Sequence, residues 1–336
     1  MPVRMKDIAE DLGVSLMTVS KALRNHHDVG EETRQRVLRR AQELNYQPNL
    51  TARGLASRRS FLIGLVVPDM MHSFFAEIAR GAADELEPRG YQILIANSGE
   101  RADRELEQIR SFMGRGVDGL ILASAAVDAS GPLAEALGAS GVRYVLIDRA
   151  IAGLSANFVG VDNEEIGYLA TAHLIEQGCT RVAHIRGLAV STGTGRLRGY
   201  RRALESHGLA APEGYVSGGE YEDGAGYSAM RRLLELQPRP DGVFCYNDPV
   251  AAGAMKAILE AGLEIPRDIA VIGAGNVHYS DLLRVPLSTI DQSSGLIGQT
   301  AAGLLTDGMR TKEPRTPRSV LFPPQLVVRA SSRRKG

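Results

Sequence analysis

The sequence predicts a small all-α unit followed by a larger α/β core made of two doubly wound parallel-sheet lobes. The chain has 336 residues, which at about 150 residues per domain leaves room for two domains and a small extra module. Apolar side chains recur at helical spacing through the first 47 residues. Beyond residue 60, short apolar runs alternate with longer helical segments, and the alternation occurs twice.

Residues 5–24 predict two short helices joined by a tight turn. Gly13 suits the turn, because glycine adopts a positive φ at little cost, and Ser15 can cap the second helix. The inner positions of both helices are apolar: Ile8, Ala9, Leu12, Val19, Ala22 and Leu23. A third helix is expected over residues 31–44. The pattern is that of a helix-turn-helix unit over residues 1–47, with an ordinary helical hairpin as the alternative.

Residues 48–60 predict a short hinge helix or linker. Pro48 ends the preceding helix, and the segment that follows is too short to be a stable helix alone. A segment that folds only on contact with DNA has this pattern, with Leu55 as a wedge in the minor groove. A plain linker is the alternative.

Residues 61–336 predict the α/β core. Its expected strands are the apolar runs LIGLVV, YQILIA, DGLILA, YVLID, RVAHIR, GVFCY and IAVIG. Helices are expected between them, over 74–86, 104–113, 131–137, 164–176, 194–206, 224–236 and 249–260. Ligands of open parallel sheets bind beyond the carboxyl ends of the strands. The polar residues expected there include Asp69, Ser124, Asp148, Arg149, Asn247 and Asp248.

The composition excludes several classes of protein. Hydrophobic residues make up 44% of the chain and charged residues 23%, which is ordinary for a globular protein. Cys179 and Cys245 are too few for a disulfide framework, so a reducing compartment is expected. No apolar run approaches the roughly 18 residues of a membrane span, and the first residues lack the apolar core of a signal peptide. We expect a cytoplasmic protein with no membrane partner.

Positive charge gathers at the start of the chain. The totals are 39 Lys and Arg against 39 Asp and Glu, so the formal net charge is zero. The first sixty residues hold eleven of the basic and seven of the acidic residues, which gives them a net charge of +4. Such an asymmetry is typical of a nucleic-acid-binding arm, although a solvated helical face would also produce it.

The second helix of the N-terminal unit carries the residues expected to read DNA. In helix-turn-helix units this helix enters the major groove, and its first outward residues contact base edges. Lys21 can donate to guanine O6 and N7, and Leu16 or Met17 can contact a thymine methyl group. The complete set of predicted DNA contacts, with the hinge included, is Ser15, Leu16, Met17, Thr18, Ser20, Lys21, Arg24, Asn49, Ala52 and Leu55.

The sequence resembles the lactose-repressor (LacI/GalR) family of bacterial transcription regulators. The matching stretches run in order along nearly the whole chain and include KDIAEDLGVSLMTVSKALRN, ARGLASRRS, FFAEIARGAADELEPRGY, GRLRGY, VFCYNDPVAAGAMKAILEAGLEIPRDIAVIG and PPQLVVRASS. The resemblance implies a DNA-binding unit, a hinge helix and a two-lobed core like the periplasmic sugar-binding proteins. It further implies a homodimer on a near-palindromic operator, with a small-molecule effector between the lobes. It places the N-lobe at about 61–160 and 291–319, and the C-lobe at about 161–290 and 320–330.

The resemblance also assigns effector contacts. Arg196 corresponds to an arginine that holds a sugar hydroxyl or a ligand carboxylate, and Asn247 and Asp248 match a ligand-facing pair. The complete set is Phe74, Asp148, Thr192, Arg196, Tyr221, Asn247, Asp248, Gly275 and Asn276. Gly275 stands where the family usually has an aspartate that binds ligand hydroxyls. This departure leaves room for a bulkier or anionic ligand held by Arg196, Arg149 or His278.

Other functions fit the sequence less well. A dinucleotide site fails because the run that begins at Gly273 has His278 where a third glycine is required. The seven histidines form no metal-ligand spacing, and no nucleophile is paired with a base, so we expect no cofactor and no enzymatic activity. A solute-binding component of a transporter would suit the core but not the basic N-terminal unit.

Overall fold

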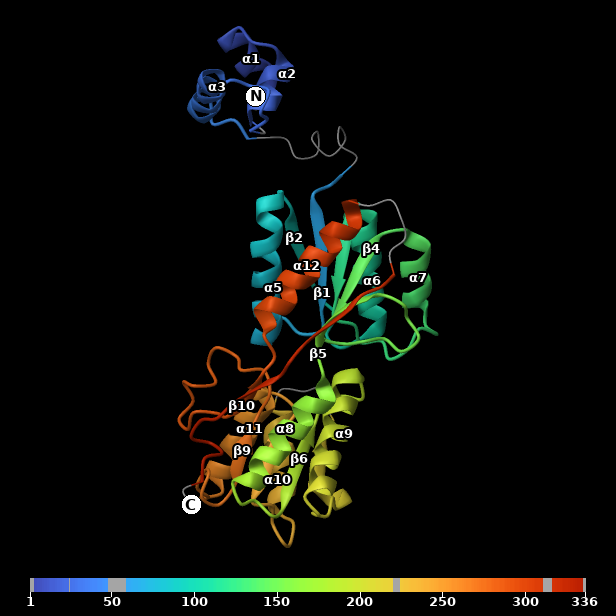
Figure 1. The fold of residues 1–336 in the computed structure, drawn as a ribbon, viewed down its shortest axis with the longest axis vertical. Helices are drawn as coiled ribbons and strands as arrows, with labels where there is room; N and C mark the ends of the chain where they lie inside the picture. The colour runs from blue at the N-terminus through green and yellow to red at the C-terminus, as the bar shows by residue number, and fades with distance from the viewer. Residues whose placement is uncertain (1–2, 24, 48–58, 220–223, 311–315, 335–336) are drawn as a thin grey trace. The chain divides into compact units, whose positions relative to one another are not determined.

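The computed structural model describes residues 3–23, 25–47, 59–219, 224–310 and 316–334 (Figure 1). The chain divides into two compact units, Met1–Ser60 and Phe61–Gly336. Most of the predicted hinge, residues 48–58, lies outside the described residues. The predicted fold class, an all-α unit followed by a two-lobed α/β core, is confirmed.

The N-terminal unit contains three helices around one small core. They are α1 (Met5–Leu12), α2 (Leu16–Leu23) and α3 (Glu31–Glu43). Ile8, Val19 and Val37, one from each helix, are fully buried. An ion pair between Arg40 and Asp11, at 2.6 Å, joins α3 to α1. The three helices therefore fold onto the apolar positions that the sequence predicts.

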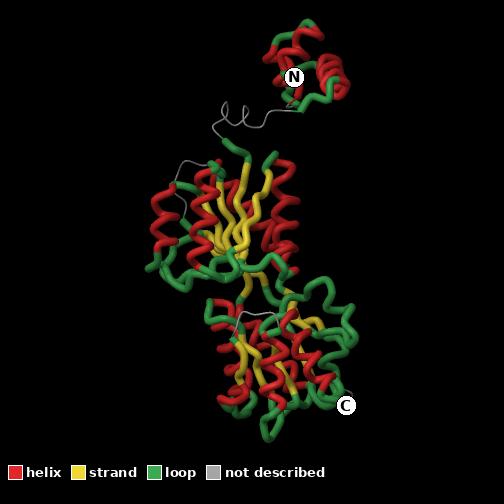
Figure 2. Tube along the Cα trace, turned by 180° about the vertical axis from the view of Figure 1, so that it is seen from behind, coloured by secondary structure: helices red, strands yellow, loops and turns green. Residues whose placement is uncertain are grey.

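The N-lobe is a six-stranded parallel sheet with helices on both faces. Its strand order is β11-β5-β4-β3-β1-β2. The strands are β1 (Leu62–Val67), β2 (Gln92–Asn97), β3 (Gly119–Leu122), β4 (Arg143–Ile147), β5 (Asn157–Val161) and β11 (Ser319–Phe322). The helices are α5 (Ser73–Leu86), α6 (Ala102–Gly114), α7 (Pro132–Ser140) and α12 (Ser294–Arg310). Helices α5 and α12 lie side by side on one face, and α6 and α7 pack on the other (Figures 1 and 2).

The C-lobe repeats this architecture with a four-stranded parallel sheet. Its strand order is β7-β6-β8-β9. The strands are β6 (Val182–Arg186), β7 (Val216–Gly218), β8 (Gly242–Cys245) and β9 (Ala270–Ile272). The helices are α8 (Asn163–Glu176), α9 (Ser191–Ser206), α10 (Ala225–Leu234) and α11 (Asp248–Glu260). A two-stranded antiparallel pair, β10 (Thr289–Asp291) and β12 (Gln325–Val327), completes the core.

The chain crosses between the lobes after β5, after β10 and after β11. The last crossing comes later than the predicted boundary at residue 319, because β11 pairs with β5 as far as Phe322 opposite Val161. Backbone pairing at the sheet edge therefore keeps this segment in the N-lobe. No helix among the described residues is long and apolar enough to span a bilayer.

Candidate functional site

The turn between α1 and α2 presents the second helix in a defined orientation. Gly13 has φ +61°, and the backbone N–H of Val14 donates to the carbonyl of Ala9 at 3.1 Å. Ser15 then caps α2, since its Oγ accepts a hydrogen bond from the backbone N–H of Thr18 at 3.0 Å. The two hydroxyls also lie 2.8 Å apart, so the side chains of Ser15 and Thr18 are engaged at the cap.

The outward face of α2 exposes large apolar side chains. Leu16 is 50% exposed and Met17 is 62% exposed, whereas Val19 and Ala22 on the opposite face are buried. Exposed apolar side chains at the first turn of such a helix are suited to contact thymine methyl groups. Ser20 and Lys21 are partly exposed on the same helix.

Lys21 is held by an acidic residue beyond the end of α2. Its Nζ donates to Asp28 Oδ2 at 2.9 Å, and this hydrogen bond lowers the pKa of Asp28. His26 and His27 approach the same carboxylate, at 3.4 and 2.8 Å. In the part of the chain that the structure describes, His26, His27 and Asp28 are the one group whose ligand atoms are close enough together for a metal ion. Lys21 on the shared carboxylate oxygen opposes cation binding there.

Four of the predicted DNA contacts, Arg24, Asn49, Ala52 and Leu55, lie outside the described residues. The other six are on or next to α2. The exposed or partly exposed side chains of Leu16, Met17, Ser20 and Lys21 form the candidate DNA-reading surface of α2.

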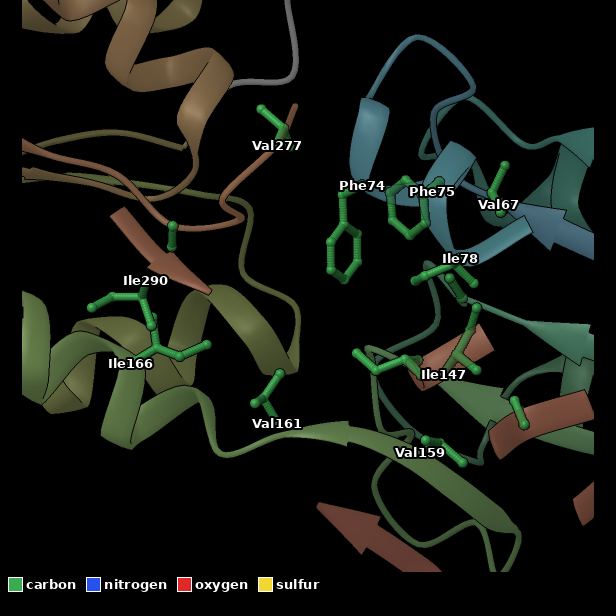
Figure 3. Close-up of a cluster of buried hydrophobic side chains, with 14 of the residues drawn as sticks. Val67, Phe74, Phe75, Ile78, Ile147, Val159, Val161, Ile166, Val277 and Ile290 are labelled. Atoms are coloured by element: carbon green, nitrogen blue, oxygen red, sulfur yellow. The ribbon is translucent and has the colours of Figure 1, made fainter. Parts of the chain in front are cut away.

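A cavity of about 650 Å³ lies between the two lobes at the carboxyl ends of their strands. Four of the predicted effector residues line it: Phe74, Asp148, Arg196 and Asn247. Figure 3 shows Phe74 at the start of α5, with Ile147 and Val159 of the N-lobe on one side and Val277 and Ile290 of the C-lobe on the other. The cavity volume falls in the range of small-molecule sites in proteins, about 300–1,000 Å³.

Two side-chain bridges link the lobes beside this cavity. His72 Nε2 lies 3.1 Å from Asn247 Nδ2, and Ser191 Oγ accepts a hydrogen bond from the Ala150 backbone N–H at 3.0 Å. Both His72 and Asn247 also cap helices, since they accept the N–H groups of Phe74 and Val250. Desolvation lowers the pKa of His72 to about 4, so its ring is neutral near pH 7.

Arg196 is buried in the cavity wall with neutral partners. Its guanidinium donates to Asn163 Oδ1 at 3.0 Å, to the Tyr246 carbonyl at 2.6 Å and to Gln292 Oε1 at 2.8 Å. The guanidinium also lies 4.7 Å from the centre of the Tyr246 ring. Three of its five N–H groups are therefore satisfied, which leaves two for a bound molecule.

The N-lobe contributes an arginine and two carboxylates. Arg149 forms a bidentate ion pair with Glu100, with both N–O distances at 2.6 Å. The side chains of Arg149, Glu100 and Asp148 are each at most 9% exposed. Asp148 has φ +60° and places its Oδ2 3.7 Å from Arg149 Nε. Burial raises the pKa of Asp148. This carboxyl group accepts no hydrogen bond from the described residues, so it is available to a ligand hydroxyl.

Asp248 does not line the cavity, in contrast to the prediction that it faces the ligand. The side chain is fully buried and accepts hydrogen bonds from Val277 N–H, Ser280 Oγ and Thr289 Oγ1, at 3.0, 2.7 and 2.6 Å. Its carboxylate therefore ties the start of α11 to the segments that follow β9. Burial raises the pKa of Asp248.

The remaining predicted effector residues lie behind the cavity wall or outside the described chain. Thr192 is buried and hydrogen-bonds to the Tyr246 hydroxyl at 2.7 Å, and Asn276 is held by Asp291 and Arg329. Thr192, Gly275, Asn276 and His278 are all missing from the cavity lining, and Tyr221 is not described. Of the three candidates for an anion, Arg149 is neutralised by Glu100, and His278 lies away from the cavity.

The lining also includes polar side chains that the sequence analysis did not predict, among them His72, Arg186, Tyr246 and Gln292. Arg186 and Tyr246 are the last residues of the predicted strands RVAHIR and GVFCY, and His72 lies two residues before the helix expected over 74–86. Gln292 follows β10, a strand that the sequence analysis did not predict. No sequence signal singles out His72, because its partner Asn247 is 175 residues away.

Comparison with known proteins places the chain in one family. A model described as bacterial regulatory proteins of the lacI family matches residues 4–49. A model described as a periplasmic binding protein-like domain matches residues 171–332. Catabolite control protein A of Priestia megaterium is 32% identical over 335 residues, which cover 99% of this chain and all of the relative. The chain belongs to the LacI family of bacterial regulatory proteins.

Solved structures extend the similarity to the LacI-family fold. A lac repressor dimer bound to operator and the anti-inducer ONPF is 26% identical, with a TM-score of 0.84 and 99% of both chains covered. A complex of the transcriptional regulator CelR with cellobiose is 31% identical, with a TM-score of 0.74 and coverage of 98% of this chain and 99% of that one. The chain is thus a LacI-family transcriptional repressor with a periplasmic-binding-protein-like core, and not an enzyme. The family resemblance seen in the sequence is confirmed.

Proposed function

We propose that this repressor binds a near-palindromic operator as a homodimer in the cytoplasm. A small polar effector, of the sugar or sugar-derivative class, binds between the lobes and changes the affinity for DNA. The observation that carries the proposal is the cavity whose wall is shared by both lobes and bridged by His72 and Asn247. A ligand that fits one separation of the lobes better than another shifts the population between them.

The DNA-reading role rests on α2. Leu16, Met17 and Lys21 lie on its outward part, and the first two expose apolar surface that no described residue of the N-terminal unit covers. The predicted base readers are Leu16, Met17, Ser20 and Lys21, with Ser15 and Thr18 at the cap near the phosphates. Arg24, Asn49, Ala52 and Leu55 are proposed to add phosphate and minor-groove contacts, with Leu55 as the wedge.

The effector class rests on the cavity wall. Carboxylates, guanidinium groups and amides face a space of about 650 Å³, with Phe74 as an aromatic surface beside them. Polar groups around an aromatic surface suit the alternating hydroxyl and C–H faces of a sugar. The similarity to a regulator solved with cellobiose supports the same class.

The homodimer rests on an exposed apolar surface of the C-lobe. Leu282 is 76% exposed, and next to it a groove of about 370 Å³ is lined by α11 and the loop that contains Leu283 and Val285. The groove residues are Ala252, Met255, Lys256, Leu259, Glu260, Leu283, Arg284 and Val285. A second copy of the chain is the proposed occupant, and the similar lac repressor was solved as a dimer.

The proposal is tested by selecting bound duplexes from a random pool with the intact protein, at a stated salt concentration. A palindromic consensus with two half-sites is expected, together with a molecular mass of two chains by light scattering. Recovery of no consensus, with or without candidate effectors, would overturn the DNA-reading role.

A further inference from the structure

Arg186, the last residue of β6, lines the cavity and has no partner for its charge among the described residues. Its side chain is half-buried, and its guanidinium forms no hydrogen bond or ion pair with a described residue. A guanidinium carries five N–H donors and stays charged at all physiological pH values. A half-buried arginine without an acceptor therefore leaves strong hydrogen-bonding capacity unused.

The other two arginines of the wall already have hydrogen-bond partners. Arg149 is neutralised by Glu100, and Arg196 donates to three oxygens. Among the described residues, the acidic residues of the wall come from the N-lobe, where Asp69 accepts the Met71 N–H and Asp148 lies beside Arg149. The described part of the C-lobe wall therefore carries positive charge without a carboxylate partner, and Arg186 is the arginine there that makes no side-chain contact with a described acceptor.

A glycine next to Arg186 leaves room for its guanidinium. A Cβ atom on Gly219, which has φ +103°, would lie 2.7 Å from Arg186 Cζ. A side chain at this position would therefore collide with the guanidinium. Gly218, with φ +88°, is equally close to the Arg186 carbonyl, where a Cβ would come within 2.9 Å. The backbone of the two glycines thus packs directly against Arg186 and limits where its planar fork can lie.

We propose that Arg186 binds an anionic group, a carboxylate or a phosphate, carried by the effector. This inference rests on the proposed function and narrows the effector to acidic sugar derivatives, such as sugar acids and sugar phosphates. The arginine fork pairs with two oxygens of such a group at once. The hydroxyls of the same molecule extend towards Asp148 and the free N–H groups of Arg196.

An internal partner is the competing explanation. Glu220, Glu222 and Asp223 follow Gly219 in the sequence and lie outside the described residues. If one of these carboxylates neutralised Arg186, its removal would expose the cation and strengthen the binding of a simple anion. A triple variant, Glu220→Gln, Glu222→Gln and Asp223→Asn, separates the two explanations.

The first test measures binding of inorganic phosphate to the full-length protein by calorimetry, with chloride held constant. The wild type is compared with Arg186→Gln, Arg186→Lys and the control Arg267→Gln, whose side chain is 69% exposed and outside the cavity. Arg186→Gln is expected to weaken phosphate binding at least tenfold, Arg186→Lys to weaken it less, and Arg267→Gln and the triple variant to leave it unchanged. Equal binding by wild type and Arg186→Gln would overturn the proposal, as would a gain of tenfold or more in the triple variant.

The second test uses matched compounds with one carbon skeleton: glucose, gluconate and glucose 6-phosphate. The acidic compounds are expected to bind the wild type at least tenfold more tightly than glucose, and Arg186→Gln is expected to abolish the preference. Gluconate against glucose 6-phosphate distinguishes the two anionic groups. Tighter binding of glucose would overturn the inference while the proposed function stands. Arg186-dependent anion binding that leaves operator affinity unchanged would sink the allosteric part of the proposed function instead.

Discussion

His72 and Asn247 join the two lobes through a contact in which each side presents a hydrogen-bond donor. His72 Nδ1 accepts the Phe74 N–H, so a neutral ring carries its hydrogen on Nε2, which faces Asn247 Nδ2 at 3.1 Å. The Asn247 oxygen is already occupied by the Val250 N–H. A neutral imidazole has one acceptor nitrogen, so one donor at this bridge stays unsatisfied. The contact is therefore weaker than its distance suggests.

The lowered pKa of His72 predicts acid sensitivity of the core. The ordinary histidine pKa of about 6.5 applies to the unfolded chain, and the folded value is about 4. Between these values the unfolded state binds more protons, so the free energy of unfolding falls as pH drops from 6.5 towards 4. His173 and His184, whose pKa values burial also lowers, act in the same direction.

The variant His72→Asn offers an amide oxygen in place of Nδ1 as the acceptor that caps α5, but it does not titrate. We expect it to reduce the pH dependence of unfolding by up to one proton, about 1.4 kcal/mol per pH unit. Urea denaturation at a series of pH values measures the slope. His27→Asn, at a side chain that is 88% exposed in the other unit, is the control. Identical slopes for wild type and His72→Asn would contradict the assignment.

The ion pair of Lys21 with Asp28 predicts opposite effects for its two members. Lys21→Ala is expected to relax specificity at one operator position, since a base contact is lost. Asp28→Asn is expected to strengthen binding to all duplexes, because it removes a negative charge and releases Lys21 from a 2.9 Å contact. Selection from randomised operators measures both. A uniform loss of affinity in Lys21→Ala would mean that this residue contacts only phosphate.

Glu100 and Arg149 form a buried pair whose disruption is expected to be costly. Glu100→Gln leaves a buried guanidinium without its counter-charge, and we expect a loss of about 3 kcal/mol in the free energy of unfolding. The matched control is Glu264→Gln, whose partner Arg267 lies 3.0 Å away on the exposed surface, with an expected change below about 0.5 kcal/mol. Equal losses in the two variants, measured by urea denaturation, would show that burial does not strengthen the Glu100 pair.

Asp248 is expected to act on stability rather than on ligand binding. Asp248→Ala leaves three buried donors unpaired, and a loss of about 3 kcal/mol in the free energy of unfolding is expected. Arg196→Gln, at a cavity-lining residue, is the comparison for ligand affinity. An Asp248→Ala protein that is as stable as the wild type but has lost anion or sugar binding would restore the ligand-facing role.

The sequence alone predicts the helices and strands whose apolar residues follow a local pattern. The three helices of the N-terminal unit follow from apolar spacing, and β1, β3 and β4 follow from their apolar runs, because each of these elements buries apolar side chains of its own. Helix α12 was not predicted. Its inner residues are small, and it packs against α5 through reciprocal glycines: a Cβ on Gly298 would lie 2.0 Å from the Ile78 carbonyl oxygen, and one on Gly81 would lie 2.1 Å from that of Gly295. Such close packing depends on a partner more than 200 residues away.

The cavity was predicted in part, for a similar reason. Strand ends located Asp148 and Asn247, since position along a parallel strand fixes which edge a residue reaches. Whether a carboxylate faces the cavity or the protein interior depends on residues that are distant in the sequence. Asp248 follows Asn247 directly, yet its carboxylate lies in the interior, where it accepts hydrogen bonds from Thr289 and Ser280 of distant segments. Arg186 is one cation among 39 in the sequence, and only the fold shows that it has no charge partner among the described residues.

The central claim is that a ligand between the lobes changes how tightly the N-terminal unit holds its operator. The direct measurement is fluorescence anisotropy of a labelled operator titrated with the full-length protein, with and without a saturating ligand that calorimetry shows to bind the cavity. We predict a change in Kd of about 5- to 150-fold, the usual range of allosteric coupling. An operator Kd that stays the same at saturation would contradict the account.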